Sequence, residues 1–219
     1  MIRVAVAGAT GRMGETTCAA VEAAEDLELT GRAAPTLGAA VADVLEDADV
    51  LVDFSLGAHV VGNASLAAHA GVHVVIGATG YDEAALREAA AGAPGNVFIA
   101  PNFAIGAVLM MRFAAEASKH MRAAEIIEYH HPAKLDAPSG TAARTAALMA
   151  GEVPIHSVRL PGIVADQDVI LGDAAQTLTI RHVTTDRTSF MPGVLLAIRR
   201  VATLPESPVI GLEKLLWPD

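Results

Sequence analysis

Short apolar runs alternate with amphipathic segments over residues 1–102. The runs are four to seven residues long and rich in small or β-branched apolar side chains, whereas the segments between them follow a helical period. This alternation predicts parallel strands joined by right-handed crossovers, which is the pattern of a Rossmann-type, doubly wound α/β domain. We expect strands at 2–7, 27–33, 50–54, 72–76 and 97–100, and helices at 12–25, 39–47, 60–70 and 82–91.

The pattern changes after residue 102. Three strand-like runs follow one another with only turn residues between them, which indicates an antiparallel or mixed sheet and therefore a second, α+β domain. A last helical segment could pack back on the first domain. We expect a dinucleotide-binding domain at 1–102 plus about 190–219, and a substrate-binding and oligomerisation domain at 103–189. In the second half, strands are expected at 126–130, 157–163, 168–171 and 176–182, and helices at 108–121, 140–150 and 194–202.

Composition narrows the class of protein. The chain is 53% apolar, which excludes a disordered protein, and its formal net charge of −10 argues against nucleic-acid or anionic-membrane binding, because both need basic surface. The single cysteine, Cys18, fits a reducing compartment. We find no secretory signal and no apolar stretch long enough to span a bilayer, so we expect a soluble cytoplasmic protein.

A glycine-rich turn follows the first predicted strand. In GATGRMG, Gly8 and Gly11 allow a tight turn and let backbone N–H groups approach a pyrophosphate, while Gly14 allows close contact between helix and strand. An ordinary βα turn also favours glycine, but this position after an N-terminal strand favours cofactor binding. The predicted cofactor-binding residues of this turn are Gly8, Ala9, Thr10, Gly11, Arg12 and Met13.

The other cofactor candidates follow later strands. A dinucleotide site usually has a carboxylate at the end of the second strand, but this chain has Arg32 there, which favours NADPH unless Arg32 is merely a solvated side chain. Ligands bind beyond the carboxyl ends of strands in open α/β sheets. Two further segments are therefore placed to touch a nicotinamide, namely Gly77, Ala78 and Thr79, and Ala100, Pro101, Asn102 and Phe103.

The segment EYHHPAKLDAPSGTA, residues 128–142, concentrates polar chemistry. His130, His131 and Lys134 lie within five positions, and Pro132 ends the strand so that both histidines can turn toward one cleft. The Ser139-Gly140-Thr141 segment predicts a helix start with exposed N–H groups, which is a carboxylate site. Together these groups can bind a dianionic acid and transfer a proton.

Other interpretations of this segment stay open. The two histidines could bind a metal ion, although no third ligand lies at a suitable spacing, and we predict no metal site. Lys134 could be a Schiff-base nucleophile or a surface side chain. Ser139 to Thr141 could be only a helix cap, and Asp136 is expected to orient the loop.

Several segments of the chain together resemble a known family. EYHHPAKLDAPSGTA together with GATGRMG, DFS at 53–55, GATG at 77–80 and APNFAIGAVLMM at 100–111 is similar to dihydrodipicolinate reductase, and RTSFMPGVLLAIRR at 187–200 resembles its actinobacterial branch. The resemblance implies a homotetramer assembled through the C-terminal sheets. It also implies NADH- or NADPH-dependent reduction of a small anionic dicarboxylate, 4-hydroxy-tetrahydrodipicolinate, in the diaminopimelate route to lysine.

The resemblance also implies residue roles. His130 would be the acid/base residue and Lys134 the proton donor, with hydride delivered to C4 of the conjugated ring after water is lost. Domain closure would use hinges near 102–103 and near 190. Substrate binding would fall to His131, Lys134, Ser139, Gly140 and Thr141.

Three departures from the family pattern leave questions open. No acidic residue lies near Ala34, so the preference between NADH and NADPH is open, and both the loop after the second strand and the connection at 151–154 are short. A reductase of another cyclic imine dicarboxylate is one alternative function. A non-catalytic nicotinamide-binding paralogue is another, but the presence of both His130 and Lys134 counts against it.

Overall fold

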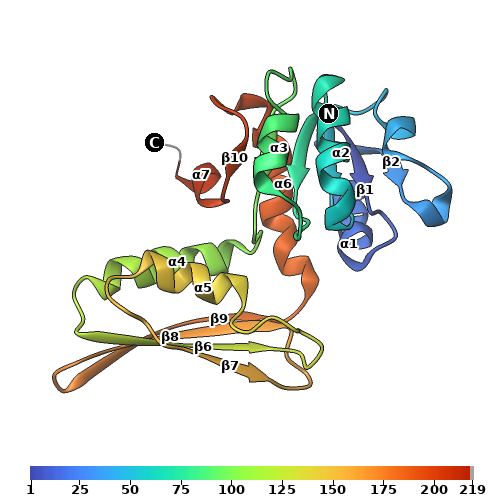
Figure 1. Cartoon of the computed structure of the whole chain (residues 1–219). Helices are drawn as coiled ribbons and strands as arrows, with labels where there is room; N and C mark the ends of the chain where they lie inside the picture. The colour runs from blue at the N-terminus through green and yellow to red at the C-terminus, as the bar shows by residue number, and fades with distance from the viewer. Residues whose placement is uncertain (218–219) are drawn as a thin grey trace. The chain divides into compact units, whose positions relative to one another are not determined.

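The computed structural model describes residues 1–217, and the chain divides into two compact units (Figure 1). The first unit contains Met1–Phe103 and the C-terminal segment from Phe190, and the second contains Ala104–Ser189. Residues 218–219, the end of the predicted first domain, lie outside the described residues. None of the helices formed by residues 1–217 is long and apolar enough to cross a membrane.

The first unit is built on a six-stranded parallel sheet. Its order is β10-β5-β4-β3-β1-β2, so the direction of winding reverses between β1 and β3. The central strands are buried on both faces, which explains their continuous apolar sequences. The strands are β1 (Ile2–Ala7), β2 (Leu27–Ala33), β3 (Val50–Asp53), β4 (His73–Ile76), β5 (Val97–Ile99) and β10 (Val209–Ile210).

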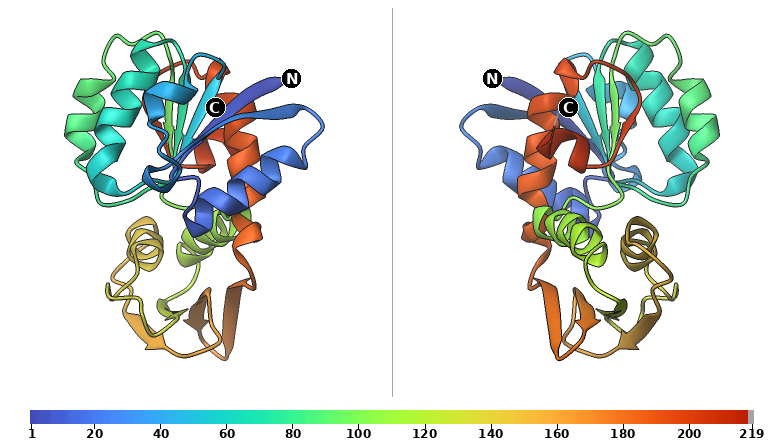
Figure 2. Two further views of the ribbon diagram at one scale, coloured as in Figure 1. Left: turned by 90° about the vertical axis from the view of Figure 1, so that its right-hand side faces the viewer. Right: turned by 90° about the vertical axis from the view of Figure 1, so that its left-hand side faces the viewer.

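Helices cover both faces of this sheet. Figure 2 shows α2 (Gly57–His69) and α3 (Glu83–Ala89) on one face, and α1 (Arg12–Glu22) and α6 (Met191–Arg200) on the other. The short α7 (Glu213–Leu216) follows β10. The buried face of α2 contains the alanines Ala64, Ala67 and Ala68, whose small side chains let the helix lie close to the sheet.

The second unit is a four-stranded mixed sheet with helices on one face (Figure 1). Its order is β7-β6-β8-β9, with β6 and β7 parallel and the other pairs antiparallel. Ile126, Val169 and Leu171 are buried on the helix-covered face. The elements are α4 (Ile105–Ser118), β6 (Ala123–His130), α5 (Gly140–Leu148), β7 (Ile155–Arg159), β8 (Ala165–Asp173) and β9 (Gln176–Thr184).

The predicted fold class, a Rossmann-type parallel sheet plus a second mixed sheet, is confirmed. The helix predicted at 39–47 is wrong, because this segment forms only a 3₁₀ turn at Val41–Val44. There the Asp43 carboxylate accepts the N–H of Ala40 at 2.8 Å and closes the turn locally. Such bonds from a short acidic side chain compete with a regular helix.

Several predicted boundaries also need correction. The helix predicted at 12–25 ends at Glu22, and the helix predicted at 108–121 runs over Ile105–Ser118. The strand predicted at 157–163 is Ile155–Arg159, because Pro161 and Gly162 form a turn before β8. We did not predict β10 or α7, since two and four residues are too few to show a period.

Candidate active site

A cavity of about 570 Å³ lies in the first unit at the carboxyl ends of β1, β2 and β3. This is where the strand order reverses, which is the usual ligand position in an open parallel sheet. Gly8, Thr10 and Gly11 of the glycine-rich turn line the cavity. The structure therefore brings the predicted turn to the edge of the sheet where a nucleotide would bind.

The turn requires glycine at two positions. Gly8 has a φ of +72°, and a Cβ there would lie 2.7 Å from the carbonyl oxygen of Phe54. A Cβ on Gly14 would lie 2.1 Å from the carbonyl oxygen of Gly8, so helix α1 can approach β1 this closely only without a side chain. The two glycines allow the backbone of the turn to face the cavity.

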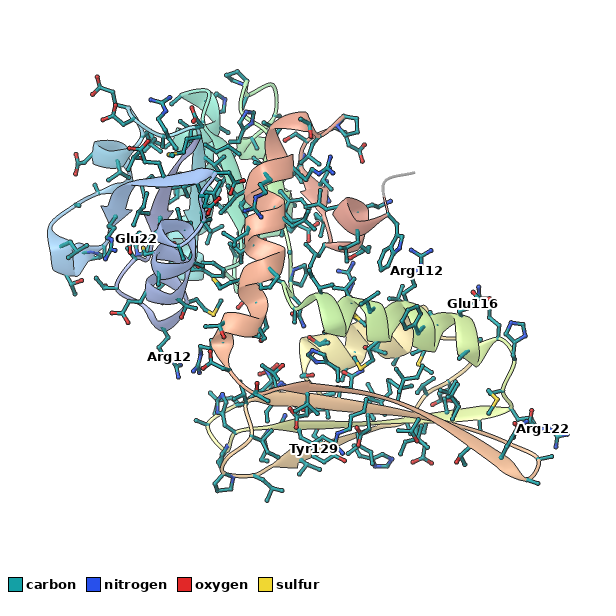
Figure 3. The ribbon with its side chains drawn as sticks, turned by 180° about the vertical axis from the view of Figure 1, so that it is seen from behind. Arg12, Glu22, Arg112, Glu116, Arg122 and Tyr129 are labelled. Atoms are coloured by element: carbon teal, nitrogen blue, oxygen red, sulfur yellow. The ribbon has the colours of Figure 1, made fainter. Side chains whose placement is uncertain are left out.

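The other predicted residues of the turn lie at the start of α1. Ala9 is buried, whereas Arg12 is exposed at the first helical position and Met13 follows it (Figure 3). A helix N-terminus attracts phosphate because its first N–H groups lack partners within the helix. Arg12 adds a positive charge at that end of α1.

The two later cofactor segments meet around a pair of phenylalanines. Gly77 directly follows β4, and a Cβ there would lie 2.2 Å from the ring of Phe54. Phe103 is buried edge-on against Phe54, with ring centroids 6.1 Å apart. Ala78 and Thr79 follow Gly77, and Ala100 to Asn102 follow β5, so both segments lie at the carboxyl ends of strands, as predicted from the order of elements.

The segment after β3, for which the sequence pattern predicts no role, supplies much of the cavity wall. Its anchor is Asp53, a fully buried residue whose carboxylate accepts the N–H of Ser55 at 2.7 Å and the side-chain amide of Asn63 at 2.9 Å. The DFS motif at the end of a central strand was the signal for these residues. Those lining the cavity are Phe54, Ser55, Leu56, His59 and Asn63.

Arg32 lies near the end of β2 but does not line the cavity. Its guanidinium donates to Glu22 of α1 at 2.7 Å, and about half of each side chain is exposed (Figure 3 labels Glu22). The cavity wall beside it consists of Ala33, Ala34 and Pro35. Arg32 would therefore have to be released from Glu22 before it could contact the ribose end of a bound nucleotide.

A second polar cluster lies in the other unit, at the end of β6. The strand ends at His130, and the chain turns at once, with the N–H of Lys134 donating to the carbonyl of His131 at 3.1 Å. The ammonium of Lys134 donates to both carboxylate oxygens of Asp136, at 2.8 and 2.9 Å, and this bond lowers the pKa of Asp136. The structure thus places Lys134 against a carboxylate.

His130 contacts a buried carboxylate through its Nδ1 atom. Its partner is Glu128, two residues earlier on β6 and fully buried. Burial lowers the pKa of His130, and the opposing influence of Glu128 reduces this effect without reversing it. A lowered pKa favours the neutral imidazole, and a carboxylate beside Nδ1 favours the tautomer in which Nδ1–H donates to Glu128 and Nε2 is an acceptor.

The predicted helix start is helix α5. Ser139 is its N-cap and is buried, and its hydroxyl accepts the N–H of Ala142 at 3.2 Å. Gly140 and Thr141, the first two helical residues, retain surface exposure. The hydroxyl of Ser139 thus caps the N-terminus of α5, and a helix N-terminus of this kind attracts an anion.

Replacing Ser139 with alanine is expected to lower the free energy of unfolding by about 1 kcal/mol, because an N–H of α5 loses its cap. Ser139→Gly is the matched variant and should cost only a few tenths of a kcal/mol, since glycine is tolerated at an N-cap. Urea denaturation of both variants measures the difference. Equal stability of Ser139→Ala and the unmodified chain would show that the cap contributes nothing.

No group of three or more His, Cys, Asp or Glu side chains within residues 1–217 is arranged to hold a metal ion. The two candidate clusters are the glycine-rich turn in one unit and the histidine–lysine loop in the other. The first suits a nucleotide, and the second suits a carboxylic acid that gains or loses a proton.

Comparison with known proteins identifies the family. Residues 2–103 match the family model described as dihydrodipicolinate reductase, N-terminus, and residues 106–216 match the one described as dihydrodipicolinate reductase, C-terminus. The chain is 45% identical to the 4-hydroxy-tetrahydrodipicolinate reductase of Mycolicibacterium vanbaalenii, over 98% of this chain and 99% of the relative. It is also 45% identical to the enzyme of that name from Thermobifida fusca, over 99% of each chain.

A solved structure extends the match to three dimensions. The dipicolinate-bound dihydrodipicolinate reductase from Paenisporosarcina sp. TG-14 aligns with a TM-score of 0.84 at 34% identity, covering 98% of this chain and 99% of that one. A probable dehydrogenase from Thermotoga maritima, at 13% identity and a TM-score of 0.68, shares the fold alone. Because both halves match and the relatives are covered almost completely, this chain belongs to the dihydrodipicolinate reductase family.

Proposed function

We propose that this chain reduces 4-hydroxy-tetrahydrodipicolinate to tetrahydrodipicolinate with NADH or NADPH, in the diaminopimelate route to lysine. The observation that carries the proposal is full-length similarity to reductases of that name, in a chain with both a nucleotide cavity and a histidine–lysine loop. The reaction consumes the nicotinamide hydride and one proton, and releases water and the oxidised cofactor. No observation favours another imine substrate or a non-catalytic role.

The first unit is the proposed dinucleotide-binding domain. When bound, the reduced nicotinamide nucleotide supplies the hydride. The turn from Gly8 to Met13 would hold the pyrophosphate through backbone N–H groups. Its backbone can take this position because Gly8 and Gly14 carry no side chain that would clash with the neighbouring backbone. Gly77 to Thr79 and Ala100 to Phe103 would bind the nicotinamide end, since both segments follow central strands.

The second unit is the proposed substrate-binding domain. Lys134 already forms two short bonds to the carboxylate of Asp136, and a substrate carboxylate of the same charge and geometry could take them over. His131, Gly140 and Thr141, together with the N-cap Ser139, complete the proposed site for two carboxylates. His130 would act as the acid/base residue through Nε2, and Lys134 would donate the proton.

We extend the proposal to assembly and location. The side of the four-stranded sheet away from α4 and α5 carries Ile127, Tyr129 and Ile170 by strand alternation, and Figure 3 labels Tyr129. Asp166, Asp168 and Arg181 lie on the same side, and a sheet face with both apolar and charged side chains suits association of four copies through their sheets. The buried Cys18 and the biosynthetic role of the relatives support a cytoplasmic location.

Hinges near 102–103 and 190 would allow closure of the two domains on the bound substrate and cofactor.

A coupled assay tests the proposed reaction. Substrate generated in situ by a dihydrodipicolinate synthase is supplied to the purified chain, and oxidation of NADH and of NADPH is followed by absorbance. We expect oxidation that depends on both the synthase and this chain. Background rates with both cofactors would overturn the proposal.

Arg32 gives a separate prediction about cofactor preference. Glu22→Gln should release Arg32 to pair with the ribose phosphate of NADPH and should lower the KM for NADPH by up to about fivefold, the effect of one exposed ion pair. Arg32→Ala should weaken NADPH more than NADH. Steady-state KM values for both cofactors measure this, and equal changes for NADH and NADPH would mean that Arg32 does not contact the phosphate.

A further inference from the structure

We propose that the buried Glu128 and the partly buried Arg159 form an ion pair that positions both His130 and the loop of Lys134 for the reaction. This inference rests on the proposed function for its kinetic meaning, and on the contacts of β6 and β7 for its geometry. Neither residue was singled out from the sequence for this role. Both are positioning residues, since they act through His130 and Lys134.

Strand pairing brings the two residues together. β6 and β7 run parallel, with His130 opposite Arg159 and Glu128 opposite Ser157. Because alternate side chains share one face of a strand, Glu128, His130 and Arg159 all point to the same face of the sheet. Residues 31 positions apart in the chain thus become direct neighbours.

Glu128 holds the ring of His130. One carboxylate oxygen contacts His130 Nδ1, and both oxygens accept from Arg159, at 3.0 Å from Nη1 and 2.8 Å from Nη2. Burial alone would raise the pKa of Glu128, but hydrogen bonds from Arg159, Ser157 and His130 outweigh it and lower that pKa. An ionised acceptor at Nδ1 selects the tautomer with Nε2 unprotonated and fixes the plane of the ring.

Arg159 also donates to the backbone of the loop that carries Lys134. Its Nη2 donates to the carbonyl of Asp136 at 2.7 Å, and its Nε donates to the carbonyl of Lys134 at 3.3 Å. Both carbonyls belong to the backbone on either side of Leu135, so one guanidinium holds the loop at two points. The same side chain therefore connects the carboxylate behind His130 to the backbone that carries Lys134.

An ion pair with one fully buried and one partly buried member needs an explanation other than stability. The side chain of Glu128 is 0% exposed and that of Arg159 is 20% exposed. Taking two charges out of water costs free energy, and a well-packed apolar pair is often as stable or more stable. The bidentate geometry and the loop contacts instead give a fixed orientation, which a proton-transfer site requires.

The test is Glu128→Gln, which keeps the shape of the side chain and removes its charge. Its matched control is Glu125→Gln on the same strand, where an exposed glutamate contacts His156 of β7 at 2.8 Å. Both variants are assayed by steady-state kinetics across the pH range of histidine titration, and their folding is checked by thermal denaturation. Arg159→Lys, which keeps the charge but loses the bidentate guanidinium, is the second variant.

The expected results are specific. Glu128→Gln should lower kcat by about 10–100-fold, by analogy with the loss of a carboxylate that orients a metal-bound histidine, with a smaller change in the substrate KM. The charges facing His130 are Glu128, Lys134, Asp136 and Arg159, and loss of Glu128 leaves the cations dominant. The limb of the pH profile set by His130 should therefore move to lower pH. Glu125→Gln should change neither kcat nor the pH profile. Arg159→Lys should lower kcat.

A readout without turnover separates this inference from the proposed function. NMR of the imidazole nitrogens should show His130 with its proton on Nδ1 in the unmodified chain and a lower His130 pKa in Glu128→Gln. An active, folded Glu128→Gln with unchanged kcat and pH profile would overturn the inference and leave the reductase proposal intact. A proton on Nε2 in the unmodified chain would overturn it whether or not the chain is active.

Discussion

Replacing Lys134 with alanine is expected to lower kcat for the reductase reaction by about 10²–10⁴-fold, the contribution of one positioned proton donor. Lys134 is only partly exposed, and its ammonium forms two short bonds to a carboxylate, so its geometry suits the binding of an anion. The KM for the dicarboxylate should also rise, because the same ammonium is proposed to hold a substrate carboxylate. The coupled assay measures both constants.

Lys119 provides the control for this variant. It is one of the three lysines of the chain, lies on the surface after α4 and contacts Glu116 at 2.7 Å. Lys119→Ala removes the same charge from an exposed ion pair and should leave kcat and KM within twofold, roughly the effect of a weak surface pair. Unchanged kinetics of Lys134→Ala would remove Lys134 from the mechanism.

The second large effect is expected from Gly14→Ala. The added Cβ would lie 2.1 Å from the carbonyl oxygen of Gly8, and backbone atoms on both sides must shift to admit it. Overpacking of this kind costs about 1–3 kcal/mol or more. Because the displaced atoms belong to the glycine-rich turn, binding of NADH should also weaken. Urea denaturation and fluorescence titration with NADH measure the two effects.

Gly62→Ala is the matched control because Gly62 also lies inside a helix, α2, and nothing occupies the space within 4 Å of its would-be Cβ. There alanine should stabilise the chain by about 0.5–1 kcal/mol, through its better helix propensity. Equal effects of the two substitutions would contradict the close packing of α1 against the turn.

The alternation of elements was enough to predict the fold class and the position of the glycine-rich turn. Both depend on local patterns: a central parallel strand is apolar throughout, and a turn with positive φ needs glycine. The 39–47 segment shows the limit of such patterns. Its apolar spacing resembles a helix, but the local bond from Asp43 to the backbone of Ala40 competes with helix formation.

The pair behind His130 could not be predicted in the same way. Alternation along β6 places Ile126, Glu128 and His130 on one face, and a charged residue in that row would usually indicate solvent. Glu128 is nevertheless fully buried, because Arg159 lies beside it on a parallel strand. The register of β6 with β7 is set by tertiary packing and leaves no trace in the local sequence.

Arg32 is a similar case. Its place near the end of β2 was predicted correctly, and its chemistry suggested a phosphate ligand. Its contact with Glu22 depends on how α1 packs beside β2, which spacing alone does not show. Side-chain partners, more than elements, were the part of the site that required the structure.

Transfer of deuterium tests the central claim most directly. The chain is supplied with synthase-generated substrate and NADH carrying deuterium at both C4 positions of the nicotinamide, and the tetrahydrodipicolinate formed is analysed by mass spectrometry. Direct hydride transfer predicts a product that contains one deuterium, formed at a rate that falls sharply in Lys134→Ala. Unlabelled product, or NADH oxidation without tetrahydrodipicolinate, would contradict the account.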